Sequence, residues 1–266
     1  MNVSVDPRFT DRRRHVQEGW ARRRLRWMLV LVGLVLILGA GIALLRSPWL
    51  AVRSVAVAGA ANAPVGEILA RHAVGPGTPT WSVRPGPIED ALEGNPWIAE
   101  AEVRVTWPGS VEVSIVERAA AAWVRLPDGW ALVAHDGMVV ATGTPEKGAP
   151  RVQAPRAEGR VGTHLENAEL VAAAEFLGTL APELAVGASA RVTAMGIELD
   201  IAGHRVLAGN GRDIAAKVAT LEAMLEAGVA RGAVINVISP TRPGALNPQS
   251  VVEGTQEDVS SFDETG

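Results

Sequence analysis

The sequence has no cysteine and no tyrosine, and its aromatic residues, eight of them tryptophan, make up only 4% of the chain. Without cysteine the chain can hold no disulfide framework, no thiolate zinc site and no cysteine nucleophile. It also lacks a His-Glu-x-x-His zinc motif, a Gly-rich phosphate loop after a strand, a Gly-x-Ser-x-Gly elbow and a Ser-x-x-Lys acylation motif. We therefore expect no enzyme: no catalytic residue, no metal and no cofactor.

Charge is distributed unevenly along the chain. The first 26 residues carry eight arginines against three acidic residues, a net charge of +5, whereas the whole chain carries −4. The rest of the chain is therefore acidic, and such asymmetry is typical of a protein that meets two compartments or two partners. The basic segment could be a solvated tail or a nucleic-acid arm, but the segment that follows gives a better reason for its charge.

An uncharged run of 19 residues, WMLVLVGLVLILGAGIALL at 27–45, follows the basic segment. At ~1.5 Å per residue it spans roughly 28 Å, close to the ~30 Å hydrocarbon core of a bilayer. The arginines before it place the N-terminus in the cytoplasm by the positive-inside rule, and tryptophans suit the two interfaces. The residues expected to flank the membrane are Arg22, Arg23, Arg24, Arg26, Trp27 and Trp49.

A cleaved signal peptide is the alternative for this run. Gly41-Ile42-Ala43 has the small-x-small form of a cleavage site, and Arg22-Arg23-Arg24 weakly resembles a twin-arginine signal. The apolar part of a signal peptide is usually ~7–15 residues long, shorter than the run here. We therefore favour a single-pass anchor with a basic cytoplasmic tail at 1–26 and the rest of the chain outside.

The segment after the membrane predicts a strand at 52–59, a helix that begins near Pro64 and a second helix at 84–92. NPWIAEAEVRVTWPGSVEVSIVER at 95–118 then alternates as two strands joined by a Pro-Gly-Ser turn. We expect Trp97 and Trp107 to hold this hairpin to the helices. The closing Glu117-Arg118 is expected to be exposed. The order β-α-α-β-β predicts a small α+β module.

From Ala119 the chain is rich in strands. Alternation predicts strands at 120–126, 130–134, 138–141, 190–194, 197–201, 204–207 and 233–239, the last closing the ordered part. Asp136-Gly137 is expected in a hairpin turn, 142–163 in a loop, and Asp213 at a helix N-cap. Helices are expected at 164–180 and over the stripe Ile214, Val218, Leu221, Leu225 and Val229. The acidic residues 248–266 are expected to be disordered.

Four features resemble the FtsQ/DivIB family of cell-division proteins, and they cover nearly the whole chain except its two tails. The most specific is Asn95-Pro96-Trp97-Ile98-x-x-Ala101-x-Val103 running through Trp107-Pro108-x-Ser110 to Glu117-Arg118. The others are the basic tail and span leading through Pro48-Trp49-Leu50 to Gly59, the strands before Asp136-Gly137, and the Lys217-bearing helix before a final strand. The motif residues are Pro96, Trp97, Trp107, Pro108, Glu117 and Arg118.

The resemblance implies a POTRA domain at 50–118 and a β domain at 119–247, and both agree with the elements predicted from the residues. It also implies a non-enzymatic scaffold of the divisome, the bacterial division machinery, that helps control septal wall synthesis. The implied partners are membrane proteins of the FtsB and FtsL type and the lipid bilayer, with no nucleic acid and no small-molecule substrate. The implied location is the inner membrane, enriched at the septum, with both folded domains extracytoplasmic.

In the family, partner binding centres on the last strand and the segment after it. The corresponding segment is Val234 to Ile238 and the run to Asn247, and the residues expected to bind are Val234, Ile235, Asn236, Val237, Ile238, Ser239, Thr241 and Arg242. Where the family often has Ile-Asp-hydrophobic-Arg, this chain has Ile235-Asn236-Val237-Ile238, so a salt bridge at this place is in doubt. Main-chain strand addition does not need those charges, and Val237→Pro is expected to abolish partner binding while the β domain stays folded.

Two other functions remain open. A POTRA-bearing transport or assembly factor of the envelope would usually carry several POTRA copies or a membrane barrel, and neither is evident in the sequence. An anchored extracytoplasmic enzyme would need a concave site with clustered carboxylates of shifted pKa, which requires a structure to detect.

Overall fold

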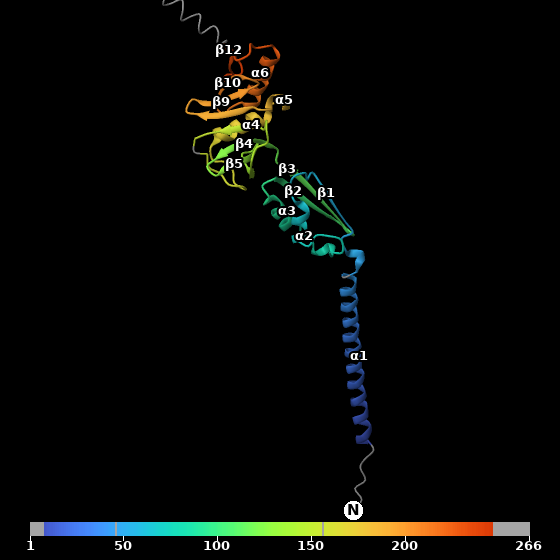
Figure 1. Ribbon diagram of the computed structural model, residues 1–266. Helices are drawn as coiled ribbons and strands as arrows, with labels where there is room; N and C mark the ends of the chain where they lie inside the picture. Colours follow the sequence, from blue (N-terminus) through green and yellow to red (C-terminus); the bar gives the residue numbers. More distant parts are fainter. Residues whose placement is uncertain (1–7, 46, 156, 247–266) are drawn as a thin grey trace, which may run out of the picture. The chain divides into compact units, whose positions relative to one another are not determined.

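The computed structural model of the protein describes residues 8–45, 47–155 and 157–246 (Figure 1). Its first element is α1 (Arg8–Leu45), a single helix that includes most of the predicted tail. Within it, Arg24–Ala43 is the one stretch in the described part of the chain that is long and apolar enough to cross a membrane, and none of its side chains is buried. This helix supports a single-pass membrane protein.

The chain divides into two compact units, and α1 belongs to the first. The described parts of residues 1–57, 69–86 and 103–113 form one unit, and those of 58–68, 87–102 and 114–266 form the other. The predicted acidic tail at 248–266 lies outside the described residues.

The module after the membrane has the predicted order of elements. They are η1 (Pro48–Leu50), β1 (Ser54–Ala58), α2 (Val65–Arg71), η2 (Thr80–Ser82), α3 (Pro85–Glu93), β2 (Ile98–Thr106) and β3 (Ser110–Glu117). The three strands form one sheet in the order β1-β3-β2, with α2 and α3 beside it (Figure 1). The β-α-α-β-β prediction is confirmed.

The alternation of β3 places its apolar side chains inside, as expected. Val111, Val113 and Ile115 are at most 6% exposed, whereas the residues between them face solvent. The prediction for Trp107 was wrong: this residue is 56% exposed and lies in the turn after β2 ends at Thr106. The alternation stops where the strand stops, so Trp107 does not continue the buried face.

The second domain is built on one nine-stranded sheet. Its strands are β4 (Ala120–Leu126), β5 (Gly129–Ala134), β6 (Val139–Gly143), β7 (Arg151–Gln153), β8 (Ser189–Thr193), β9 (Gly196–Ile201), β10 (His204–Gly209), β11 (Val234–Asn236) and β12 (Gly244–Leu246). The order is β12-β11-β10-β9-β8-β7-β4-β5-β6. The prediction of a loop at 142–163 was wrong at β7, which lies within it. The strand predicted at 233–239 is shorter, since β11 ends at Asn236, and β12 follows it.

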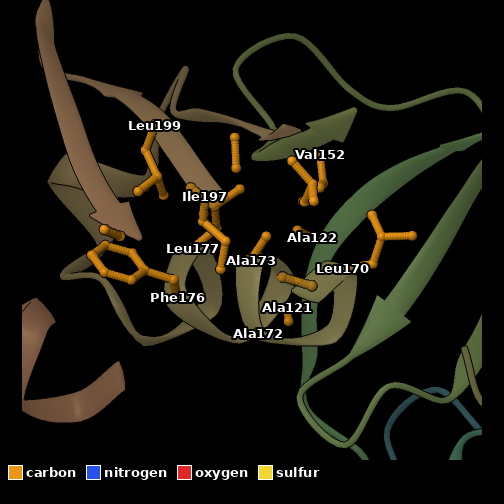
Figure 2. Close-up of a cluster of buried hydrophobic side chains, with 14 of the residues drawn as sticks. Ala121, Ala122, Val152, Leu170, Ala172, Ala173, Phe176, Leu177, Ile197 and Leu199 are labelled. Atoms are coloured by element: carbon orange, nitrogen blue, oxygen red, sulfur yellow. The ribbon is translucent and has the colours of Figure 1, made fainter. Parts of the chain in front are cut away.

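Three helices accompany this sheet: α4 (Ala168–Thr179), α5 (Pro182–Ala185) and α6 (Ile214–Glu226). Figure 2 shows how Phe176 and Leu177 of α4 point toward Ile197 and Leu199 of the sheet, and all four are at most 1% exposed. Small alanines on α4 let helix and strands approach closely (Figure 2). The α+β class is confirmed, with a β-rich second domain flanked by helices.

Glu117, at the end of β3, binds the loop between β1 and α2. Its carboxylate accepts hydrogen bonds of 2.8–3.0 Å from the backbone N–H groups of Ala61, Asn62 and Ala63 and from the Asn62 side-chain amide. Partial burial raises the pKa of Glu117, but these hydrogen bonds outweigh it and hold the pKa below its ordinary value of 4.5. The carboxylate therefore fixes the loop that begins α2.

Arg118 is not exposed as predicted, since only 15% of its side chain is accessible. Its Nη1 donates to the carbonyls of Pro96 (3.0 Å) and Ile98, its Nε donates to Asp136 Oδ2 at 2.7 Å, and its own N–H donates to Trp97 O. Desolvation raises the pKa of Asp136, but the Arg118 hydrogen bond and charge, helped by the Met138 N–H and His164, lower it overall. One guanidinium thus joins the start of β2 to the turn before β6.

We predict that Arg118→Met destabilises this junction by about 1–3 kcal/mol, because it leaves two carbonyls and a carboxylate without their donor. Hydrogen–deuterium exchange of the full chain in detergent should show faster exchange over 96–98 and 136–138. Arg191→Met, an exposed arginine of β8, is the matched control and should leave these amides unchanged. Equal exchange in both variants would show that Arg118 does not hold the junction.

We predict a second, pH-dependent effect at Glu117. Because its folded pKa lies below 4.5, the carboxylate stabilises the loop above that pH, and this contribution is lost as the pH falls through the folded pKa. Glu117→Gln should lower the protection factors of the amides at 61–63 at neutral pH, and the difference from wild type should shrink in acid. A difference that stays constant with pH would contradict the role of the charge.

Candidate interaction edge of the β domain

An open sheet has two edges, and here the outermost strands are β6 and β12. The β6 edge is partly covered, because Val139 donates to Thr163 O at 3.0 Å and accepts from the Gly162 N–H at 2.9 Å. No such cover is present over β12 in the described part of the chain. An uncovered edge is a ready template for another strand, so β12 is the candidate site.

The register identifies which backbone groups of β12 face outward. β11 pairs parallel with β10 and antiparallel with β12, and Val237 N–H donates to Leu207 O at 2.9 Å. Because backbone groups alternate along a strand, the N–H and C=O of Ile235 face β10, whereas those of Val234 and Asn236 face β12. Ala245 is opposite Ile235, so its N–H and C=O face away from β11. All three residues of β12 are exposed, Leu246 by 64%.

The residues predicted to bind a partner lie beside this edge rather than on it. Ile235 and Val237 are completely buried, and the Val237 N–H is used within the fold. The expectation that Val237→Pro would leave the β domain folded is therefore wrong, because proline removes an internal hydrogen bond. Partner binding by the predicted set stays a prediction. Its exposed members are Asn236, Ile238, Ser239, Thr241 and Arg242.

Asn236 explains why β11 ends early. Its side-chain Oδ1 accepts the N–H of Ile238 at 3.0 Å, which offers the backbone a local partner in place of the ladder. The chain then turns, with Arg242 N–H donating to Ser239 O, and returns as β12. Asn236, which stands where the family often has aspartate, thus stabilises the turn between β11 and β12 in this chain. Ile238 is left 50% exposed beside the edge.

Lys217 on α6 secures the strand next to β11. The residue is only 1% exposed, and its Nζ donates to Ala208 O (2.8 Å), Asn210 O (2.7 Å) and Asn210 Oδ1 (3.2 Å). These acceptors satisfy all three ammonium hydrogens. Burial lowers the pKa of Lys217, while the nearby Asp213 carboxylate opposes the change. Lys217 therefore holds α6 to the end of β10, the strand with which β11 pairs.

The other residues singled out in the sequence do not join this edge. Trp27 and Trp49 are exposed at the two ends of the apolar run. Arg24 and Arg26 are exposed on α1, and the side chains of Arg22 and Arg23 lie outside what the structure describes. Pro96, Trp97 and Arg118 belong to the junction described above, and Glu117 binds the loop before α2. The Trp107–Pro108 peptide bond is cis. Asp213 occupies the N-cap position of α6, but its side chain makes no capping hydrogen bond.

The arrangement does not favour proton-transfer chemistry. Among the described residues no group of three or more His, Asp or Glu side chains is placed to hold a metal ion. Of the carboxyl groups in the described ranges, Glu117 and Asp136 have a clearly shifted pKa, which in both is lowered; Glu117 binds a loop and Asp136 binds an arginine. A general acid or base needs a pKa closer to the working pH.

The sequence did not predict β12 as a strand, although Gly244, Ala245 and Leu246 lie within the run to Asn247 that the family resemblance implies for partner binding. Three residues are too few for alternation to be visible, and the predicted last strand ended at Ser239. The available signal was Pro243-Gly244, a turn dipeptide that separates two short apolar segments.

Comparison with known proteins gives consistent matches. The profile described as "POTRA domain, FtsQ-type" matches residues 50–118. A protein named "Cell division protein FtsQ" from Streptomyces bingchenggensis is 31% identical over 241 residues, which cover 85% of this chain and 90% of that protein. Its namesake from Mycobacteroides abscessus is 28% identical over 82% of this chain and 69% of its own length. The namesake from Mycolicibacterium smegmatis is 33% identical over 45% of this chain, and only 36% of that relative's length is matched.

We predict that Lys217→Met lowers the free energy of unfolding by about 3 kcal/mol, since each buried carbonyl left without a donor costs about 1–3 kcal/mol. Urea unfolding of the full chain in detergent measures the change. Ala219→Met adds the same side chain at an exposed position of α6 and should be nearly neutral. Equal midpoints for the two variants would contradict the assigned role of Lys217.

Proposed function

Since the chain belongs to the FtsQ family of cell-division proteins, we propose that it is a non-enzymatic scaffold of the divisome that helps control septal wall synthesis. The scaffold recruits partners by accepting a strand at the β12 edge. The partners proposed are single-pass division proteins of the FtsB and FtsL type.

The protein is single-pass, and we propose that its N-terminus is cytoplasmic and that both folded domains are outside the inner membrane. The support is the run of arginines before the apolar segment, of which Arg24 and Arg26 are exposed on α1. We also propose that the protein is enriched at the septum, because that is where a divisome scaffold acts.

The observation that carries the proposal is the exposed β12 edge. A strand added there would pair with the outward N–H and C=O of Ala245, which need no particular side chain. The exposed Leu246 and Ile238 give the added strand apolar surface beside its backbone contacts. Recognition of this kind tolerates the missing charges at Asn236 and Ile238, because main-chain hydrogen bonds supply the affinity and pockets between side chains supply the selectivity.

We predict that Ala245→Pro abolishes co-purification of FtsB- and FtsL-type partners with the full chain from detergent-solubilised membranes. Proline removes the one outward N–H of β12 and leaves the inward groups of Gly244 and Leu246 intact, so the β domain stays folded. Ala245→Ser keeps that N–H and is the matched control, which should bind like the wild type. Unfolding midpoints of both variants establish that the fold is unchanged.

Normal co-purification by a folded Ala245→Pro variant would refute strand addition at β12. The scaffold role has its own test, because a protein that recruits division proteins localises to the septum and supports division in cells depleted of the natural copy. A wild-type chain that stays evenly distributed and fails in such cells would refute the divisome role itself.

A further inference from the structure

Besides Trp27 in the apolar run, three tryptophans are exposed among the described residues of the compact unit that contains α1. Trp49 is 76% exposed, Trp81 53% and Trp107 56%. Large apolar side chains scattered singly need no explanation, but three exposed indoles in one small unit call for one. Indole is the side chain that prefers the boundary between lipid and water, because its ring is apolar and its N–H is polar.

The three tryptophans lie on segments that meet at the first residues after η1. On one side, Val52 N–H donates to Thr78 O at 2.7 Å and Ala51 forms a bridge with Pro79, two residues before Trp81. On the other, Arg53 N–H donates to Gly109 O at 2.7 Å, two residues after Trp107. The chain that leaves the membrane is therefore held between the two turns that carry Trp81 and Trp107.

A short tether keeps this meeting point close to the bilayer. Leu45 ends α1, and Ala51 is six residues further along, a distance of at most about 22 Å at ~3.3–3.6 Å per residue. The turn at Pro48–Leu50 is a 3₁₀ helix, whose smaller rise shortens the reach further. Trp49 lies on the tether itself, and the turns that carry the other two indoles are bonded to the residues where the tether ends.

The part of the POTRA domain that belongs to the unit with α1 is basic. Its residues in the unit with α1 (47–57, 69–86 and 103–113) carry four arginines against one glutamate, a net charge of +3. Its residues in the other unit (58–68, 87–102 and 114–118) carry seven acidic side chains against one arginine, or −6. The arginines of the first group are exposed: Arg53, Arg71, Arg84 and Arg104. Such a charge favours anionic headgroups.

We propose that Trp81 and Trp107 act with Trp49 to dock the POTRA domain on the headgroup region of the membrane that α1 crosses. The indoles insert between headgroups, and Arg53 and Arg84 pair with anionic phosphates. The domain is then held at the bilayer surface by two extra contacts and is not simply suspended from its helix. The proposal requires only that α1 spans the membrane, and it does not depend on the binding of division proteins.

The absence of cysteine allows the test to use the full chain with one introduced label site. Ser82→Cys and Thr106→Cys place a nitroxide next to Trp81 and Trp107, and Ala60→Cys places one beyond the other end of β1; all three positions are exposed. The labelled proteins are reconstituted in phosphatidylcholine vesicles with and without phosphatidylglycerol. Collision rates of each nitroxide with oxygen, which enters lipid, and with a nickel chelate, which stays in water, give its depth.

We expect the ratio of oxygen to nickel collisions to be several-fold higher at 82 and 106 than at 60, and higher still with phosphatidylglycerol. Trp81→Ser with Trp107→Ser should abolish the difference while the signal at 60, which reports the fold, stays unchanged. Equal ratios at the three sites, or lipid contact that survives loss of both tryptophans, would overturn the proposal. Burial that develops only when other division proteins are added would assign the surface to a protein partner and also overturn it.

Discussion

An open β-sheet always ends in two strands whose outer backbone groups need a partner, and this constraint organises the second domain. The chain covers one end itself, by returning to Val139 with the segment at 162–163. It does not cover β12 within the described residues. β10 and β11 are parallel strands, so a crossover has to connect them, and α6 lies in that crossover. The position of the open edge thus depends on how α6 sits on the sheet.

Charged side chains fix the places where regular structure ends. Glu117 binds three N–H groups before α2, Arg118 binds two carbonyls before β2, and Lys217 binds two carbonyls at the end of β10. In each case an ionised group satisfies backbone groups that no helix or strand can pair, and such bonds are stronger than neutral ones. In a sequence, charged residues of this kind could suggest catalysis. In this protein they hold the ends of helices and strands in place.

The sequence predicted the fold where a pattern repeats and failed where it does not. Alternation over eight or nine residues identified β2 and β3, and the stripe from Ile214 to Leu221 identified α6. β7 and β12 have three residues each, which is less than two periods of a strand, and they pair only because neighbouring strands are already in place. Trp107 was misjudged because the alternation was continued one residue past the end of β2. For the same reason the sequence pointed to the segment from Val234 to Asn247 as a whole but did not show that its end forms the outermost strand.

The two proposed surfaces use different chemistry, and this difference has a consequence for how the protein responds to its surroundings. Strand addition at β12 depends on neutral main-chain hydrogen bonds and on the apolar Leu246, neither of which salt screens. Docking by Trp81 and Trp107 is assisted by exposed arginines near a charged surface, and that assistance falls off within a Debye length, about 8–10 Å at physiological ionic strength. Changes in salt or in the fraction of anionic lipid should therefore shift the membrane contact of the POTRA domain while leaving the recognition of a partner strand unaltered. A scaffold built in this way can change its position over the membrane without releasing what it binds.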